Sequence, residues 1–114
     1  MNKIAYIFNG IIRVNGTGSD ILDLVAVGSG TIHDIVRYCA YRKGVPFVSC
    51  PTAASVDGFC SSVAAMTWDG FKKTFTAVAP KIVIADLDII SKAPTFLTNS
   101  GFGDMIGKFI ALAD

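Results

Sequence analysis

The sequence predicts an α/β fold, in which parallel strands are joined through a helix and a β-hairpin is added. Two short apolar runs, residues 21–27 and 45–50, have the length and composition of buried strands. A glycine turn and a stretch of helical periodicity lie between them, which is the order of a βαβ unit with parallel strands. Further along, Asp69-Gly70 separates the β-prone runs 62–68 and 71–77, a pattern typical of a hairpin with a type I′ turn.

The helix of the βαβ unit is expected to follow the glycine turn at residues 28–30 and to end at Gly44, a residue typical of a helix C-cap. Its apolar residues recur at helical spacing and predict a buried face made of Ile32, Ile35, Val36, Cys39 and Ala40. The basic residues Arg37, Arg42 and Lys43 fall mostly on the opposite side, where we expect solvent.

The two ends of the chain add smaller elements. Asn9-Gly10 lies between the β-prone runs 4–8 and 11–14 and predicts another hairpin, followed by a polar linker at residues 15–20. Residues 81–85 predict a further buried strand, residues 88–92 a short helical turn, and Pro94 the start of a helical segment. After Gly101-Phe102-Gly103, a helix is expected with an apolar face made of Met105, Ile106, Phe109, Ile110 and Leu112.

The composition bounds the size of the protein. Its 114 residues have room for one small domain, yet 52% of them are hydrophobic and only 17% are charged. A free-standing domain of this size buries only about 60–70% of its surface. The chain is therefore expected to be a piece of a larger protein or to pair with another surface. The apolar helix pattern that continues to Asp114 favours a sequence that stops inside a domain.

Charge and cysteine content limit the kinds of binding partner and the cellular compartment that we expect. The formal net charge of +1 offers no basic surface for nucleic acid or an anionic membrane. No apolar run reaches the ~20 residues that a membrane helix needs, and no signal peptide is recognisable. Three cysteines, an odd number without close pairing, predict reduced and mostly buried thiols, which indicates the cytoplasm.

Residues 51–61 are the strongest candidate for a ligand-binding loop. They follow a buried strand and offer Thr52, Ser55 and Asp57 on a segment that proline and glycine keep from forming a regular helix. Irregular segments at the ends of α/β strands often hold ligands. Ser and Asp also cap neighbouring elements, so the residues alone leave both interpretations open.

The glycine turn at residues 28–30 also has two interpretations. Glycines let the backbone approach a phosphate, which the free amides at a helix start attract. The same glycines suit a tight connection that needs positive φ angles. Lys72 and Lys73 on the second hairpin either contact a phosphorylated substrate or, as we favour, are solvated strand charges.

Four motifs occur in this order: VGSGTIHD at residues 27–34, PTAASVDGFCS at 51–61, GFKKT at 70–74 and GFGD at 101–104. Together they resemble the sn-glycerol-1-phosphate dehydrogenase family, within the group of dehydroquinate synthase-like and iron-containing alcohol dehydrogenases. The resemblance covers roughly residues 24–114. It implies part of a Rossmann-like NAD(P)-binding domain at 24–93 and the first helices of a C-terminal metal-binding domain at 94–114, whereas residues 1–23 find no counterpart.

The resemblance implies reduction of dihydroxyacetone phosphate to sn-glycerol 1-phosphate by NADH or NADPH, for glycerophospholipid synthesis. It also implies a divalent metal, zinc or nickel, that polarises the ketone oxygen. By position, it assigns Asp57 to the substrate and assigns Asp104, as the catalytic residue, to both the metal and the substrate. It assigns a further set of residues to the binding of the dinucleotide: Gly28, Gly30, Thr31, Ile32, His33, Asp34, Thr52, Ser55 and Ser61.

The chain also departs from the family that it resembles. The other two metal ligands of that family are histidines in the later helical domain, whereas the one histidine here, His33, lies in the nucleotide turn. We expect His33 to be a partly exposed residue at the helix start, and the metal site to be incomplete in this chain. Two alternatives stay open: a glycerol dehydrogenase that acts on the unphosphorylated polyol, and a non-catalytic module that binds a nucleotide or forms a homo-oligomer.

Overall fold

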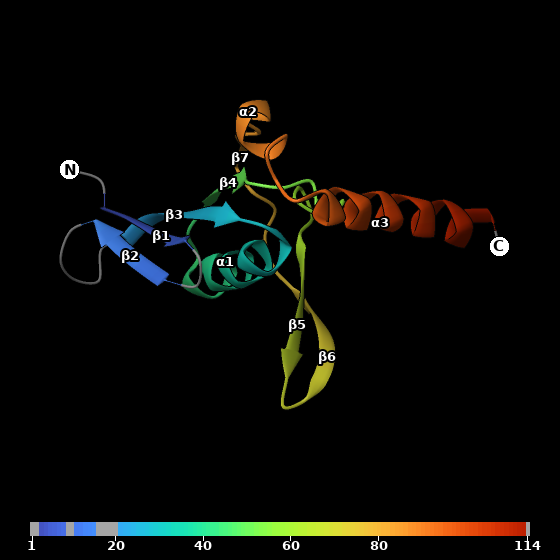
Figure 1. The fold of residues 1–114 in the computed structure, drawn as a ribbon. Helices are drawn as coiled ribbons and strands as arrows, with labels where there is room; N and C mark the ends of the chain where they lie inside the picture. The colour runs from blue at the N-terminus through green and yellow to red at the C-terminus, as the bar shows by residue number, and fades with distance from the viewer. Residues whose placement is uncertain (1–2, 9–10, 16–20, 114) are drawn as a thin grey trace.

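The computed structural model describes residues 3–8, 11–15 and 21–113, with side chains described for residues 23–113. In chain order the described elements are β1 (Lys3–Phe8), β2 (Ile11–Asn15), β3 (Ile21–Gly28), α1 (Gly30–Lys43), β4 (Phe47–Pro51), β5 (Val63–Trp68), β6 (Phe71–Thr76), β7 (Ile82–Val83), α2 (Leu87–Ile90) and α3 (Thr95–Ala113). Figure 1 shows a central body from which the hairpin β5–β6 and the helix α3 project.

Five strands form one mainly parallel sheet. Its order is β2-β1-β3-β4-β7, and the pairs β1–β3, β3–β4 and β4–β7 are parallel. Because α1 connects β3 to its neighbour β4, the predicted βαβ unit and the α/β class are confirmed. The antiparallel pair β1–β2 confirms the N-terminal hairpin. Its turn, Asn9-Gly10, and residues 16–20 of the predicted linker lie outside the described residues.

A small apolar core lies between α1 and the sheet. Leu24 of β3 and Phe47 of β4 are paired in register, and both are buried. Val36 and Ala40 of α1 pack in the same cluster. The residues of α1 that are buried form one stripe with spacings of three and four: His33, Val36, Arg37 and Ala40.

The burial predicted for α1 is therefore wrong at three positions: two residues predicted to be buried are exposed, and one predicted to face solvent is buried. Ile35 and Cys39 are exposed, whereas Arg37 is only 2% exposed. Arg37 is buried because its stem lies along the core, with Cζ 5.9 Å from the centroid of the Phe47 ring, and because its guanidinium finds acceptors inside the protein. Apolar periodicity carries no information about those acceptors.

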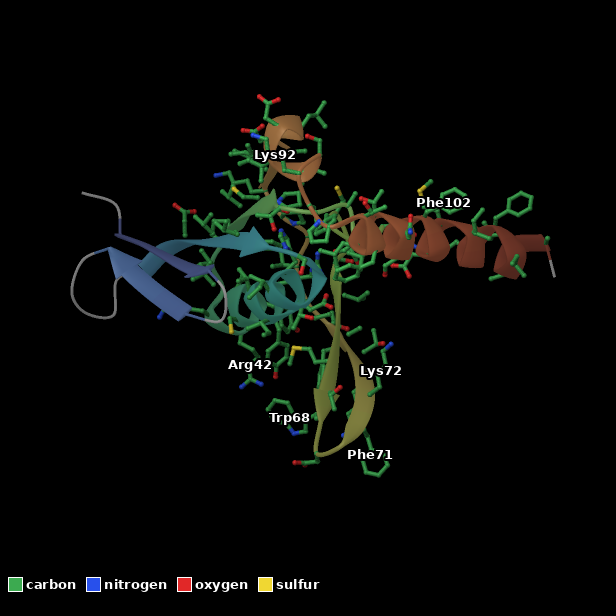
Figure 2. The ribbon with its side chains drawn as sticks, in the orientation of Figure 1. Arg42, Trp68, Phe71, Lys72, Lys92 and Phe102 are labelled. Atoms are coloured by element: carbon green, nitrogen blue, oxygen red, sulfur yellow. The ribbon has the colours of Figure 1, made fainter. Side chains whose placement is uncertain are left out.

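The hairpin β5–β6 is confirmed together with its turn. Asp69 and Gly70 have φ angles of 50° and 78°, and a type I′ turn requires both to be positive. The hairpin contacts α1 through Tyr38 and Phe75, whose ring centroids lie 5.3 Å apart. Its far end carries Trp68 and Phe71 away from the sheet (Figure 2), and both side chains are exposed.

The prediction of a buried strand at residues 81–85 is wrong in one respect. A strand forms, but it is the two-residue β7 at the edge of the sheet, and Ile82 and Val83 are exposed. Pairing with β4 holds it, together with a hydrogen bond from the amide of Ile84 to the carbonyl of Ser49 (2.7 Å). Its side chains stay exposed because α1 covers β3 and β4 and not this edge.

The helix α3 is continuous over 19 residues, so the GFGD motif lies inside it rather than before it. It projects away from the body (Figure 1), and its buried residue is Gly101. The predicted apolar face is present but exposed, as Phe102 illustrates (Figure 2). Neither α3 nor another helix in the described ranges is long and apolar enough to cross a membrane.

The three cysteines are free thiols, as predicted, but they are not buried as predicted. Cys39 and Cys60 are exposed, and Cys50 is partly buried. Cys39 lies beside the buried stripe of α1, and Cys60 lies on the loop that follows β4, so neither is enclosed by the core.

Candidate functional site

The start of α1 is arranged to receive an anion. Its first intrahelical hydrogen bond runs from the amide of His33 to the carbonyl of Ser29 (3.2 Å). Three preceding amides therefore have no intrahelical acceptor: those of Gly30, Thr31 and Ile32. The Ser29 side chain does not cap them, and the first turn contains no acidic residue. Because the helix dipole adds positive potential at this end, it attracts a negatively charged group.

The turn between β3 and α1 requires glycine at position 28. Gly28 has a φ angle of 153°, and a Cβ there would lie 2.9 Å from Cγ1 of Ile32. Its carbonyl accepts a hydrogen bond from the amide of Thr52 (3.0 Å), which ties the turn to the loop at residues 51–61. The two predicted ligand-binding segments thus meet at the carboxyl ends of the neighbouring parallel strands β3 and β4, where α/β sheets bind ligands.

The loop at residues 51–61 is irregular beyond the end of β4, as predicted, and α3 packs directly on it. A Cβ at Gly101 would lie 2.9 Å from the carbonyl carbon of Ala54 and 3.2 Å from that of Ser55. Helix and loop backbones therefore touch at a distance that a side chain would prevent. Ser55 is buried, and its Oγ has no hydrogen-bond partner among the described residues.

His33 is buried, so the expectation of a partly exposed residue is wrong. Its Nδ1 lies 2.9 Å from the carbonyl oxygen of Ser29, which can only accept, so Nδ1 carries the proton. Its Nε2 then accepts from the hydroxyl of Ser49 at 2.7 Å, and the ring meets Phe59 edge-on with centroids 4.8 Å apart. Burial lowers the pKa of His33; the bond to Ser29 opposes this, and the charge of Arg37 adds to it. A neutral imidazole with both nitrogens engaged is not available to a metal.

Arg37 is a candidate functional residue that the sequence interpretation missed. Its Nη1 donates to Oδ1 of Asp34 (2.7 Å) and to the carbonyl of Val63 (3.3 Å). Its Nη2 donates to the carbonyls of Gly58 (2.9 Å) and Phe59 (3.2 Å). Burial raises the pKa of Asp34 and the charge of Arg37 opposes it. The signal in the sequence was the three-residue spacing of Asp34 and Arg37, which suits an ion pair on one helix face.

The helix start, the loop, the hairpin and α3 together line a cleft of about 400 Å³. Six residues predicted for the site line it: Gly30, His33, Asp34, Asp57, Ser61 and Asp104. Arg37 and Lys72 line it as well. Five other predicted residues do not: Gly28, Thr31, Ile32, Thr52 and Ser55. Of these, Thr31 lines a separate cavity between α1 and β5.

Two carboxylates reach this cleft from different elements, Asp57 from the loop and Asp104 from α3. Lys108, one turn after Asp104, places its Nζ 2.7 Å from Oδ2 of Asp57. The pair is partly exposed, so it stabilises the contact by at most about 1 kcal/mol. It is a second link between α3 and the loop, and the sequence interpretation did not single out Lys108.

The donors present do not fit a complete metal site. Asp104 offers one carboxylate, but no group of three or more His, Cys, Asp or Glu side chains comes together in the part of the chain that the structure describes. Enzyme zinc sites use three protein ligands, and both nitrogens of His33 are engaged elsewhere. A metal would therefore need ligands in addition to those described here.

The fold is similar to part of a solved dehydrogenase structure. A crystal structure of glycerol dehydrogenase from Schizosaccharomyces pombe superposes with a TM-score of 0.71 and 29% identity, over 80% of this chain and 24% of that one. The chain belongs to the iron-containing alcohol dehydrogenase family, whose sequence model matches residues 10–94. This match includes part of the segment 1–23 for which no counterpart was recognised.

Two relatives are named glycerol-1-phosphate dehydrogenase (NAD(P)+). The protein of Bacillus licheniformis is 53% identical and that of Bacillus subtilis (strain 168) 52% identical, each over 91 residues. The resemblance read from the four motifs is therefore confirmed. Each match covers 80% of this chain but 23% of the relative, so the chain spans about a quarter of the length of these relatives. The domain boundary at residue 94 stays a prediction.

Proposed function

We propose that the chain is part of an NAD(P)-dependent glycerol-1-phosphate dehydrogenase, which reduces dihydroxyacetone phosphate to sn-glycerol 1-phosphate. One observation carries the proposal: a single cleft brings the start of α1 together with Asp57 and Asp104. The named relatives support both the reaction and the dinucleotide. A role in glycerophospholipid synthesis and a cytoplasmic setting, which the free thiols support, belong to the same proposal.

In this proposal the start of α1 holds the pyrophosphate of the dinucleotide. The amide of Gly30, which lines the cleft, donates a hydrogen bond to a phosphate oxygen, and the amides of Thr31 and Ile32, residues that do not line it, contribute the positive potential of the helix start. Gly30 lines the cleft without a side chain, which lets a phosphate reach the backbone. Ser61, also at the cleft, adds a hydroxyl. When bound, the reduced nicotinamide supplies the hydride.

Asp57 and Asp104 bind the triose phosphate in this proposal. Carboxylates accept hydrogen bonds from substrate hydroxyls, and the two approach the cleft from separate elements, which orients a short polyol between them. Lys72, which the sequence favoured as a solvated strand charge, lines the same cleft, and we therefore assign its positive charge to the substrate phosphate. That charge favours a phosphorylated substrate over free glycerol. A divalent metal, zinc or nickel by resemblance, would use Asp104 as one ligand and take the others from beyond the described residues.

We attribute the exposed apolar side chains of β7, α2 and α3 to contact with further polypeptide. Leu87, Phe102 and Phe109 are 74%, 65% and 72% exposed, and apolar surfaces of this kind mark interaction sites. The additional length of the relatives would supply such a cover, and so would a homo-oligomer. Sedimentation velocity of this chain separates the two, because only the second gives self-association.

Titration calorimetry with NADH and NADPH tests the dinucleotide site. We expect 1:1 binding to the wild-type chain and loss of binding in Gly30→Val, since a Cβ there already lies 3.0 Å from Cγ1 of Val56 and the side chain would occupy the phosphate position. Gly107→Val is the matched control, because a Cβ at that position meets nothing within 4 Å. Absence of binding by the wild type would overturn the proposed site, and equal binding by Gly30→Val would overturn its location.

Substrate assays separate the other candidate functions. The structural match to a glycerol dehydrogenase favours an unphosphorylated polyol, and the incomplete donor set favours a nucleotide-binding module without turnover. NADH oxidation with dihydroxyacetone phosphate in the presence of Zn²⁺ or Ni²⁺ supports the proposal. Oxidation with dihydroxyacetone alone supports the glycerol dehydrogenase, and NADH binding without oxidation supports the module.

A further inference from the structure

We propose that Arg37 is a positioning residue, which holds residues 57–63 in the shape that presents Asp57 and Ser61 to the cleft. The inference rests on the proposed function, because it concerns how those two side chains meet a ligand. Arg37 acts through the loop backbone, to which its guanidinium is bonded.

The bonds of Arg37 lie on both sides of the residues that it positions. Its Nη2 bonds the carbonyls of Gly58 (2.9 Å) and Phe59 (3.2 Å), directly after Asp57. Its Nη1 bonds the carbonyl of Val63 (3.3 Å), beyond Ser61. The same guanidinium is therefore bonded to the loop both after Asp57 and after Ser61.

The same segment is closed by hydrogen bonds of its own. The amide of Ser61 donates to the carbonyl of Gly58 (3.0 Å), and Oγ of Ser61 accepts from the amide of Val63 (3.1 Å). These bonds form a turn whose carbonyls face Arg37. Without the guanidinium, these carbonyls would lose their charged partner in a partly buried place, and the turn would open more readily.

An arginine suits this task better than a lysine. Its planar guanidinium presents several donors in a fixed geometry, whereas an ammonium is a single point. Asp34 fixes the orientation of the group with its 2.7 Å bond and balances its charge. At 2% exposure, Arg37 has little water within reach as an alternative partner.

His33 contributes a second contact from the same stripe of α1, one turn earlier. Its ring meets that of Phe59 edge-on, and Phe59 also gives its carbonyl to Arg37. The helix whose start is proposed to bind the dinucleotide therefore also fixes the loop that is proposed to bind the substrate. These contacts link the two halves of the site through α1.

Hydrogen–deuterium exchange of the ligand-free chain tests this role. In Arg37→Met, the amides of Ser61 and Val63 should exchange about tenfold to a hundredfold faster, because a charged hydrogen-bond partner is lost. Amides of β3 and β4 should keep their wild-type rates. Arg37→Lys should give intermediate rates, since one ammonium can replace some but not all of the hydrogen bonds that the guanidinium donates. The control is Arg42→Met, which removes an exposed arginine from the same helix and should change nothing at residues 58–63.

Each outcome decides the question. Unchanged exchange at Ser61 and Val63 overturns the proposal, and so does faster exchange that is uniform over the sheet and the loop, because that shows a general loss of stability. If Arg37→Met does not fold, Arg37→Lys decides by the same two criteria. NADH affinity, measured in parallel, should be at least about tenfold weaker in Arg37→Met. Because the exchange experiment uses no ligand, a wild-type chain that fails to bind NADH overturns the proposed function and not the role of Arg37.

Discussion

Replacing Gly101 with alanine should separate α3 from the loop that it packs on. Gly101 is the buried residue of this 19-residue helix. An added Cβ would lie 2.9 Å from the carbonyl carbon of Ala54 and 3.2 Å from that of Ser55. The carbonyl oxygen of Ala54 would lie closer still. Because carbon atoms in contact are ordinarily about 3.5–4.0 Å apart, the helix and the loop would have to separate by at least about 1 Å.

Two opposing terms set the size of the effect. Overpacking of this kind costs about 1–3 kcal/mol, whereas exchanging glycine for alanine in a helix interior stabilises by up to about 1 kcal/mol. Gly103 and Gly107 lie in the same helix, and a Cβ at either position meets nothing within 4 Å. The alanine variants at those two positions isolate the second term. The second term is common to all three variants, so Gly101→Ala should be about 1–3 kcal/mol less stable than either control.

Urea unfolding followed by circular dichroism gives the unfolding free energies of the three variants. Hydrogen exchange at Ala54 and Ser55 reports on the contact itself and should accelerate only in Gly101→Ala. If Gly101→Ala is as stable as Gly103→Ala, with unchanged exchange at the loop, then α3 does not pack on the loop through this glycine. The placement of Asp104 in the cleft would be refuted with it.

Three further predictions concern charged and titrating groups. The wild-type unfolding free energy should decrease as the pH falls below about 6.5, because the lowered pKa of His33 lets the unfolded chain bind the proton first. In His33→Gln, urea midpoints should lose this dependence, and a flat wild-type profile would contradict the buried, neutral His33. Asp34→Ala should destabilise by about 3 kcal/mol in urea unfolding, because it leaves the buried charge of Arg37 without its partner. Lys108→Met should cost less than about 1 kcal/mol, and only at low salt, because its pair with Asp57 is partly exposed; equal losses for the two variants would contradict this difference in burial.

The turn and cap residues were predictable because their structure depends on a few neighbouring atoms. Asp69-Gly70 adopts the two positive φ angles that its residue types favour, and Gly44 ends α1 in the left-handed conformation with a φ angle of 72°. The order of apolar runs likewise predicted the parallel strands β3 and β4 and the helix between them. The GFGD motif marked α3 but not its extent, because glycine is compatible with both a helix and its boundary.

The burial of charged and polar residues was not predictable from local patterns. Arg37 is enclosed because carbonyls far along the chain accept hydrogen bonds from its guanidinium. One of them, that of Gly58, lies 21 residues later in the sequence. His33 is buried because Ser49, 16 residues away, donates to its second nitrogen. The exposure of β7 depends on which strands α1 covers. None of these partners can be read from the spacing of residues on one element.

By itself, the sequence determined the α/β class, the family and six of the residues at the cleft. These follow from local backbone sterics, from periodicity and from four short motifs. The tertiary structure decided which elements meet: Gly101 against Ala54, Lys108 against Asp57, and Arg37 against the loop carbonyls. Most buried hydrogen-bonding groups find partners wherever the fold brings them, and those partners can be far away along the chain.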